Sequence, residues 1–304
     1  MKSAVYHESL HLDMNQLLPP DEKCPFCFSK DRKRTVLLQK DPDVYLLICK
    51  NCYAASASRI PTEEALDQFY SNYYVGEMTN KITFYLPERL AVHIYKNSKS
   101  FIDRKKISIL DFGGGDGAIA VELAKKLIAN KCEHVKITLV DYNSQIKNIN
   151  DSRINIKHHS KLNEINNQQY DIIIASAIIE HLPQPINELT SLLKLIRKGG
   201  VFYARTPYIF PILTLFNTFR LNLDFTYPGH LHDLGPLFWN NIINNLKLSE
   251  GYQIIRSAPS MVETSFKENF FRTLCAYILK APWFVFRNKY KIVGGWEVFI
   301  RRTT

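Results

Sequence analysis

The 304-residue chain is 46% hydrophobic and 12% aromatic, a composition that supports a packed globular core and excludes an intrinsically disordered protein. Its formal net charge of +10 is uneven, because the segment from residue 265 onward holds eight Lys or Arg against two Glu and so contributes +6. No apolar run approaches the length of a membrane-spanning helix and the polar N-terminus is unlike a signal peptide, so we expect a cytoplasmic protein whose basic end can associate with the inner face of a membrane.

Four of the six cysteines form two Cys-x-x-Cys pairs near the start of the chain. Cys24 and Cys27 make the first pair, and Cys49 and Cys52 make the second after 21 intervening residues. Two such pairs can supply four thiolates to one tetrahedral ion, and zinc is the metal that this spacing favours. Disulfides are disfavoured in a reducing compartment. We therefore predict a zinc-ribbon module over residues 1–60, with a structural Zn²⁺ that has no open coordination position.

The segment between the cysteine pairs, 34–48, has the pattern of a β-hairpin. A helix follows the module, with Thr62 as its N-cap and acidic residues in its first turn. Several aromatic residues come next. We predict a helical linker over 61–104, in which Tyr73 and Tyr74 are candidates for a lid over the cofactor.

An apolar strand that contains Asp111 runs into a glycine turn, which opens a helix at Ala118. The turn contains Gly113, Gly115 and Gly117, and glycines let backbone N–H groups approach a nucleotide-like ligand closely. Counted from Gly113, the pattern satisfies the dinucleotide fingerprint GxGxxG/A. Counted from Asp111 it is D-x-G-x-G-x-G, which resembles motif I of class I S-adenosylmethionine (SAM) methyltransferases. Pyrophosphate needs no acid at this place, whereas the ammonium group of SAM suits one.

A second acid, Asp141, ends the next predicted strand, where its carboxylate can accept both ribose hydroxyls of a nucleoside cofactor. A third buried strand, 170–177, leads into the sequence Glu-His-Leu-Pro at 180–183. This closely resembles the fourth strand and following loop of methyltransferases that act on small molecules. We expect Tyr142 and Ser176, at the ends of these two strands, to contact the cofactor as well.

A helix over 186–196, a basic helix end at Arg197 and Lys198, a Gly-Gly stop and a strand from Val201 complete the series. The elements over about residues 105–206 thus resemble a class I methyltransferase core in order and spacing. The resemblance implies SAM as the cofactor. It also implies an α/β, Rossmann-like fold with a seven-stranded, mostly parallel sheet.

The cysteine module, the linker helix and this core together resemble a bacterial methyltransferase group associated with sugar and polysaccharide biosynthesis. The resemblance covers roughly residues 20–256. The nucleotide-sugar C-methyltransferases of that group carry a Glu-His pair after the fifth strand, which supplies a substrate-side base. Here His230 matches the histidine, but Gly229 replaces the Glu. We therefore favour O-methylation of a sugar hydroxyl, in a nucleotide sugar or a surface glycan, over C-methylation.

Methyl transfer from a sulfonium is an in-line displacement, so the enzyme must remove the proton of the acceptor oxygen. A neutral histidine suits that task, and we expect His230 or His181 as the base, with Tyr227 as a third catalytic candidate. Two alternatives are open. The histidines could serve only as hydrogen-bonding loop residues, or a divalent metal could gather Glu180, His181, His230 and His232.

The C-terminal domain, 105–304, is expected to carry insertions at about 207–240 and 258–293. The first is apolar and suited to capping a substrate pocket. The second separates the last two predicted strands, and it contains a helical pattern over 266–279 followed by aromatic and basic residues. That combination predicts contact with a membrane surface. The alternative is an accessory helix that covers the pocket or forms the face of a homodimer.

Two rival functions stay open at this level. An RNA methyltransferase can also combine a zinc module with such a core, and the basic tail would suit a phosphate backbone. Nucleic acid is nevertheless less favoured than a small-molecule or glycan partner, because the chain lacks a compact Arg/Lys-rich stripe. A non-catalytic SAM-fold binding module is opposed by the intact glycine turn and its paired acids.

Overall fold

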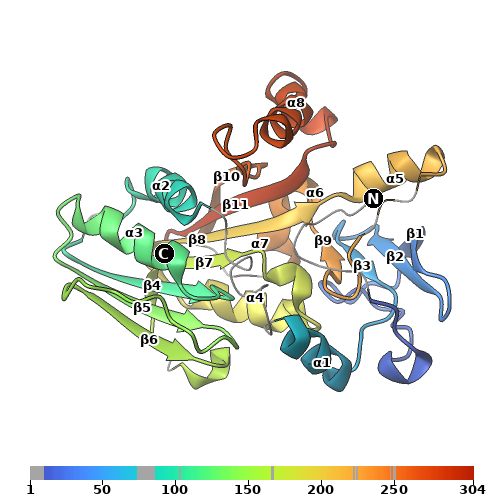
Figure 1. Ribbon diagram of the computed structural model, residues 1–304, viewed down its shortest axis with the longest axis horizontal. Helices are drawn as coiled ribbons and strands as arrows, with labels where there is room; N and C mark the ends of the chain where they lie inside the picture. Colours follow the sequence, from blue (N-terminus) through green and yellow to red (C-terminus); the bar gives the residue numbers. More distant parts are fainter. Residues whose placement is uncertain are drawn as a thin grey trace.

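The computed structural model describes residues 10–73, 86–102, 104–165, 168–221, 223, 225–246, 248 and 251–304. These residues form a large twisted sheet covered by helices and, beside it, a small second sheet from the N-terminal part of the chain (Figure 1). The helices are α1 (Glu63–Tyr73), α2 (Pro87–Ser98), α3 (Ala118–Ile128), α4 (Pro185–Lys194), α5 (Phe210–Thr218), α6 (Pro236–Asn240), α7 (Ile242–Asn245) and α8 (Phe270–Phe286). None of the described helices is long and apolar enough to cross a membrane.

The large sheet has seven strands in the order β10-β11-β8-β7-β4-β5-β6. Only β11 runs antiparallel to its neighbours, β8 and β10. The predicted seven-stranded, mostly parallel, Rossmann-like sheet is therefore confirmed. Its strands are β4 (Lys106–Phe112), β5 (His134–Val140), β6 (Ile154–His159), β7 (Tyr170–Ser176), β8 (Ile196–Tyr208), β10 (Tyr252–Pro259) and β11 (Gly294–Arg302).

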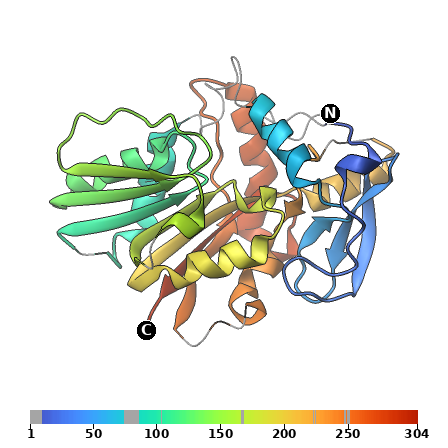
Figure 2. The same cartoon turned by 90° about the horizontal axis from the view of Figure 1, so that it is seen from below.

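Helices bury both faces of this sheet. Successive strand residues point to opposite sides, so each strand contributes side chains to both faces. Leu110 and Ile173 pack in a cluster with the apolar side of α4. Their neighbours Ile109 and Ile172 pack in a second cluster with α2 and α3. Accordingly α4 lies below the sheet in Figure 1 and in front of it in Figure 2, whereas α2 and α3 lie on the opposite face.

The strand order reverses between β4 and β7. The chain goes from β4 outward to β5 and β6, then returns to the other side of β4 as β7. Ligands bind open α/β sheets at such a reversal, beyond the carboxyl ends of the strands. The glycine turn after β4 and the loop after β7 meet there, since a Cβ on Gly113 would lie 2.4 Å from Cγ1 of Ile178.

The small sheet joins the N-terminal module to a distant part of the chain. It contains the predicted hairpin, β1 (Arg32–Gln39) and β2 (Val44–Cys49), followed by β3 (Ala55–Ala57). Its fourth strand is β9 (His232–Asp233), which pairs with β3. Phe225, Tyr227 and Leu231 also share an apolar cluster with β1, β2 and β3. The segment around His230 is thus packed against the cysteine module.

Two sequence-based expectations about local structure need correction. Arg197 and Lys198 belong to β8 and not to a helix end, because α4 stops at Lys194 and Tyr170 already pairs with Ile196. The helix expected at 266–279 is α8, which starts later because the Asn269 side chain accepts a hydrogen bond from the Arg272 backbone, and which continues through Pro282. The apolar insertion after β8 forms α5, and Leu213 within it packs against the small sheet.

Candidate functional site

A cavity of about 1570 Å³ opens at the reversal of strand order. This volume exceeds the roughly 300–1,000 Å³ of a typical single-ligand pocket. The glycine turn and Asp141 line one part of it, which we call the cofactor side. The loop after β7, His230 and residues of α8 also line it, and we call this part the acceptor side. The cavity therefore has room for a cofactor and an acceptor.

Asp111 lies buried beneath the glycine turn. Its Oδ2 has no hydrogen-bond partner among the described residues, and burial, together with the charge of Asp141, raises the pKa of its carboxyl to about 7. A Cβ on Gly114 would lie 2.4 Å from Cγ of Asp111, so only glycine lets the turn pass this close to the acid. A buried carboxylate without a cation is costly, and the ammonium group of SAM fits this position.

The three glycines of the predicted motif all have positive φ, but they do not all reach the cavity. Gly113 (φ 69°) and Gly115 (φ 61°) lie in its wall. Gly117 (φ 79°) instead begins α3 and faces the side chains of Leu139 and Ile156. Its contribution is to let the chain turn from the loop into the helix.

Asp141 connects the end of β5 to the glycine turn. Its Oδ2 accepts from the Gly115 N–H and its Oδ1 from the Asn143 N–H, each at 2.8 Å. A carboxylate can accept about four hydrogen bonds, so both oxygens can also receive ribose hydroxyls. Tyr142 is exposed at the cavity edge, and the Oγ of Ser176 is buried in the wall without a described partner.

Two histidines face each other on the acceptor side. The rings of His181 and His230 have centroids 5.0 Å apart. His181 Nδ1 donates to the Gly229 carbonyl at 2.5 Å, and His230 Nδ1 lies 2.7 Å from Oγ1 of Thr226. Burial lowers the pKa of His181 to about 4, so this ring is neutral near pH 7. With Nδ1 donating, Nε2 is the basic nitrogen of His181.

Glu180 adds a buried acid to the histidine pair. Its Oε1 is 4.0 Å from Nε2 of His181, and its Oε2 has no described partner. Burial raises the pKa of this carboxyl to about 8. Three side chains here can each offer one atom to a metal ion, and these atoms lie within 4.8 Å of one another. They belong to Glu180, His181 and His230.

Residues 84–233 match the family model for a methyltransferase domain. This range contains the glycine turn, Asp141, Glu180 and both facing histidines. The protein is a SAM-dependent methyltransferase. No protein with a curated description matches the chain.

Several solved methyltransferases have a similar arrangement of elements. The plantazolicin methyltransferase BpumL, in complex with S-adenosylhomocysteine (SAH), is 15% identical, with a TM-score of 0.48 over 80% of this chain and 92% of that one. Magnesium protoporphyrin IX methyltransferase from Synechocystis PCC 6803 is 11% identical, with a TM-score of 0.45 over 79% and 95%. Coclaurine N-methyltransferase is 12% identical, with a TM-score of 0.45 over 71% and 70%.

Two other candidates for catalysis lie outside the cavity wall. The Tyr227 hydroxyl donates to the Arg59 carbonyl at 3.1 Å, within the apolar cluster of the small sheet. His232 Nε2 donates to the Leu182 carbonyl at 2.8 Å, and its ring packs against Phe26. Both side chains therefore hold the acceptor-side loops of the methyltransferase in place. Of the proposed lid, Tyr74 and the side chain of Tyr73 fall outside the described residues.

A set of charged residues in the cavity wall was not among the site residues expected from the sequence. Arg205 forms an ion pair with Glu263 at 2.5 Å. Lys280 donates to the Ser260 carbonyl at 2.7 Å, and burial lowers its pKa to about 8. Arg272 contributes a third cation to the wall. Two of them could have been noticed in the sequence, because Arg205 interrupts an apolar strand and Lys280 interrupts an apolar helix.

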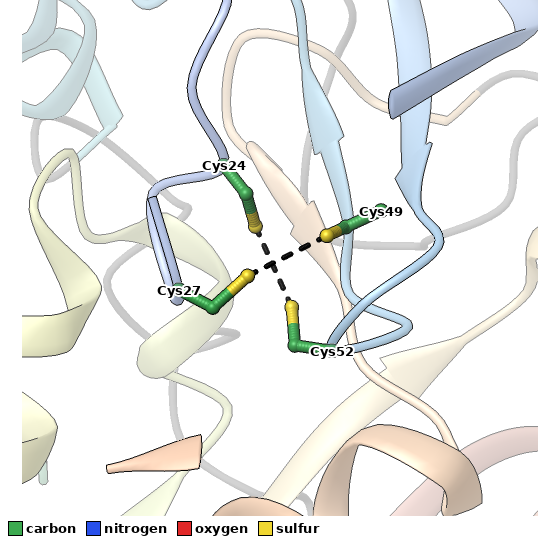
Figure 3. A group of neighbouring side chains, drawn as sticks. All are labelled: Cys24, Cys27, Cys49 and Cys52. Carbon is green, nitrogen blue, oxygen red and sulfur yellow. Dashed lines mark hydrogen bonds between the residues drawn. The ribbon is translucent and has the colours of Figure 1, made fainter. Parts of the chain in front are cut away.

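The four predicted metal ligands of the methyltransferase converge on one point (Figure 3). The Sγ atoms of Cys24 and Cys52 lie 3.5 Å apart, as do those of Cys27 and Cys49. Four thiolates at 2.3 Å from a tetrahedral zinc would be about 3.8 Å from one another. A hydrogen bond from Cys52 lowers the pKa of the Cys24 thiol to about 5, which favours a thiolate. The donor set thus fits zinc.

A short chain of contacts connects the cysteine cluster to the histidine pair. The Ala57 N–H donates to the Leu231 carbonyl, and the Leu231 N–H donates to the Glu180 carbonyl, each at 2.8 Å. Phe26, between the first two cysteines, packs against His232. The position of His230 therefore depends on the cysteine module.

Proposed function

We propose that this methyltransferase transfers the methyl group of SAM to a sugar hydroxyl, in a nucleotide sugar or a surface glycan. The observation that carries the proposal is the pair of facing imidazoles, His181 and His230, in the wall of the cavity that the glycine turn also lines. SAM supplies a methyl group on a sulfonium, and the protein has to activate the acceptor oxygen. Neutral imidazoles are suited to receive the proton of a hydroxyl.

In the proposed mechanism His230 is the general base. Thr226 holds its Nδ1 edge, and the opposite nitrogen takes the hydroxyl proton as the acceptor oxygen bonds to the methyl carbon and the carbon–sulfur bond breaks. His181 orients the acceptor from the neighbouring position. Holding the oxygen in line behind the methyl group supplies the rest of the acceleration.

Two features support a nucleotide-sugar acceptor. Arg272 and Lys280 place cations in the acceptor wall beside the Arg205–Glu263 ion pair, where they suit the phosphates of a nucleotide sugar. Gly229 stands where the resembling C-methyltransferases have a Glu, so the pair that would remove a carbon-bound proton is incomplete. The four-cysteine module is also shared with that group, and we propose that it holds a structural Zn²⁺.

The base assignment is tested by His230→Ala. We expect turnover to fall about 10²–10⁴-fold, with SAH affinity by calorimetry unchanged, because Asp111 and Asp141 lie on the other side of the cavity. His134→Ala, a change at an exposed position on β5, serves as the control. Near-normal turnover in His230→Ala would remove this residue as the base.

The acceptor is tested with labelled SAM offered to nucleotide sugars, polysaccharide fractions and RNA in parallel. We expect label in the carbohydrate fractions as an acid-stable methyl ether. Label in RNA would replace the sugar proposal with a nucleic-acid acceptor. A methyl group on carbon, identified by NMR, would show C-methylation instead.

A second candidate for hydroxyl activation is a divalent cation held by Glu180, His181 and His230. The observation that favours it is their mutual approach within 4.8 Å together with the unpartnered Oε2 of Glu180. Both rings are anchored through Nδ1 by a neighbouring oxygen, as metal-ligating histidines commonly are. Electron paramagnetic resonance with Mn²⁺, which the thiolates do not favour, distinguishes the candidates. A bound Mn²⁺ signal that Glu180→Gln abolishes would support the ion over the base.

A further inference from the structure

Helix α8 exposes large apolar side chains along its outer face. Thr273 and Trp283 are buried on its inner face, and Lys280 on that face donates to the Ser260 carbonyl. The outer face carries Phe271, Ile278 and Val285, whose side chains are 78%, 61% and 76% exposed. These three are seven residues apart, so they lie in one row along the helix.

The row is part of a larger apolar surface. The other large apolar side chains of α8 that are exposed are Phe270, Tyr277, Phe284 and Phe286. Figure 1 shows α8 standing above the sheet at the top of the molecule. Helices at the surface of a soluble domain normally turn such a face inward, and a contiguous exposed apolar patch marks an interaction site.

Basic residues border this surface at both ends. Lys267 precedes α8, and Arg287, Lys289 and Lys291 follow it. The guanidinium of Arg287 lies 4.7 Å from the ring centroid of Trp283, which keeps it at the C-terminal end of α8. Glu268 is the one acid between residues 264 and 296. A partner for this surface must therefore combine an apolar interior with negative charge at its boundary.

We propose that α8 binds the surface of a bilayer that contains anionic lipid, with its outer face in the interfacial region and its basic ends among the headgroups. Aromatic and aliphatic side chains with flanking cations are the features of interfacial helices. The helix has 17 residues and does not meet the requirements for a membrane span. A second copy of the chain is a poorer partner, because a symmetric contact through this face would bring like charges together.

The same helix forms part of the cavity wall. Arg272, Leu279 and Lys280 line the acceptor side, so a membrane-bound α8 would hold that side of the cavity at the lipid surface. If the proposed function is correct, this arrangement suits an acceptor that is itself membrane-anchored and carries phosphate beside its sugar.

The test is co-sedimentation of the full chain with vesicles of phosphatidylcholine containing about one third phosphatidylglycerol. We expect binding that weakens in about 0.5 M NaCl. In the double variant Phe271→Glu/Val285→Glu the affinity for vesicles should fall at least about tenfold, because two apolar side chains that enter the lipid interface are replaced by charges. The matched control is Leu10→Glu/Leu37→Glu, which adds the same charge at exposed apolar positions outside α8, and it should bind normally.

Several results would overturn the proposal. They are absence of binding at low salt, equal binding to pure phosphatidylcholine, and equal loss in both double variants. A dimer in light scattering that Phe271→Glu/Val285→Glu dissociates would assign the surface to self-association. Calorimetry with SAH confirms that each variant is folded. Since vesicle binding is measured without turnover, its outcome is independent of the proposed methyl transfer.

Discussion

The two sides of the cavity are built in different ways. The cofactor side comes from one strand–turn–helix–strand unit between Asp111 and Tyr142, in which neighbours in space are near neighbours in sequence. The acceptor side gathers His181, His230 and Lys280 from three separate segments, and the N-terminal module supports one of them. Binding of SAM and turnover should therefore respond separately to substitution.

Loss of the proposed Zn²⁺ is expected to give the largest separation of the two sides. We expect Cys52→Ser to unfold the cysteine module, since structural zinc in small modules contributes roughly 10–16 kcal/mol of apparent binding free energy. Displacement of His230 should then lower turnover at least about 100-fold. Metal analysis, SAH calorimetry and an activity assay measure the three consequences. Cys275→Ser, at an exposed position, is the control. Loss of SAH binding as well would show that the two sides are not independent.

Asp141→Asn should weaken binding of SAM and leave turnover at saturating SAM nearly unchanged. The amide keeps the shape of the side chain but loses the charge that accepts from Gly115 and Asn143 and that would receive the ribose hydroxyls. We expect the SAM dissociation constant to rise about 10–100-fold, with kcat at saturating SAM within about threefold. Asp151→Asn, on an exposed loop, should change neither. A fall in kcat alone would contradict the assigned role.

Asp111→Asn should improve stability while weakening the cofactor site. The folded-state pKa of about 7 is above the ordinary value, so the cost of burying the charge appears as pH rises above about 4 and is complete above about 7. We expect the variant to gain roughly 1–3 kcal/mol in the free energy of unfolding at pH 8 and less at pH 5. Urea unfolding at both pH values measures this, and SAH affinity should fall about tenfold. A gain independent of pH would refute the assignment of a buried unpaired charge.

The smallest expected effect is the acid sensitivity that His232 gives to the acceptor side. Burial lowers the pKa of His232 to about 3. Between about pH 6.5 and 3 the unfolded chain therefore binds a proton that the folded chain excludes, and the free energy of unfolding decreases as the pH is lowered. In His232→Asn the loss of stability between pH 7.5 and 5.5 should shrink by about 1 kcal/mol. Equal pH dependence in variant and wild type would show that this ring titrates normally.

Local patterns predicted the elements of the sheet and of the cofactor side well, because each depends on residues close in sequence. The hairpin between the cysteine pairs, the glycine turn and the strands ending near Asp141 and Ser176 all lie where the sequence placed them. Boundaries failed where distant contacts decide them. The pairing of Tyr170 with Ile196 draws Arg197 and Lys198 into β8, and neither residue carries a local signal for that.

By itself the sequence determined the class of fold, the position of the glycine turn and the four cysteines that come together in the N-terminal module, since spacing along the chain is enough to recognise each of them. Only the tertiary structure decided which histidines meet. His230 and His232 are two residues apart, and a fully extended chain would turn both to the same side. His230 instead lies before β9 in a turn, where its N–H donates to the Thr226 carbonyl at 3.1 Å, and it reaches the cavity. His232 belongs to β9 and packs against Phe26. The physical reason is that pairing of β9 with β3, far away in the sequence, fixes where the turn ends and the strand begins.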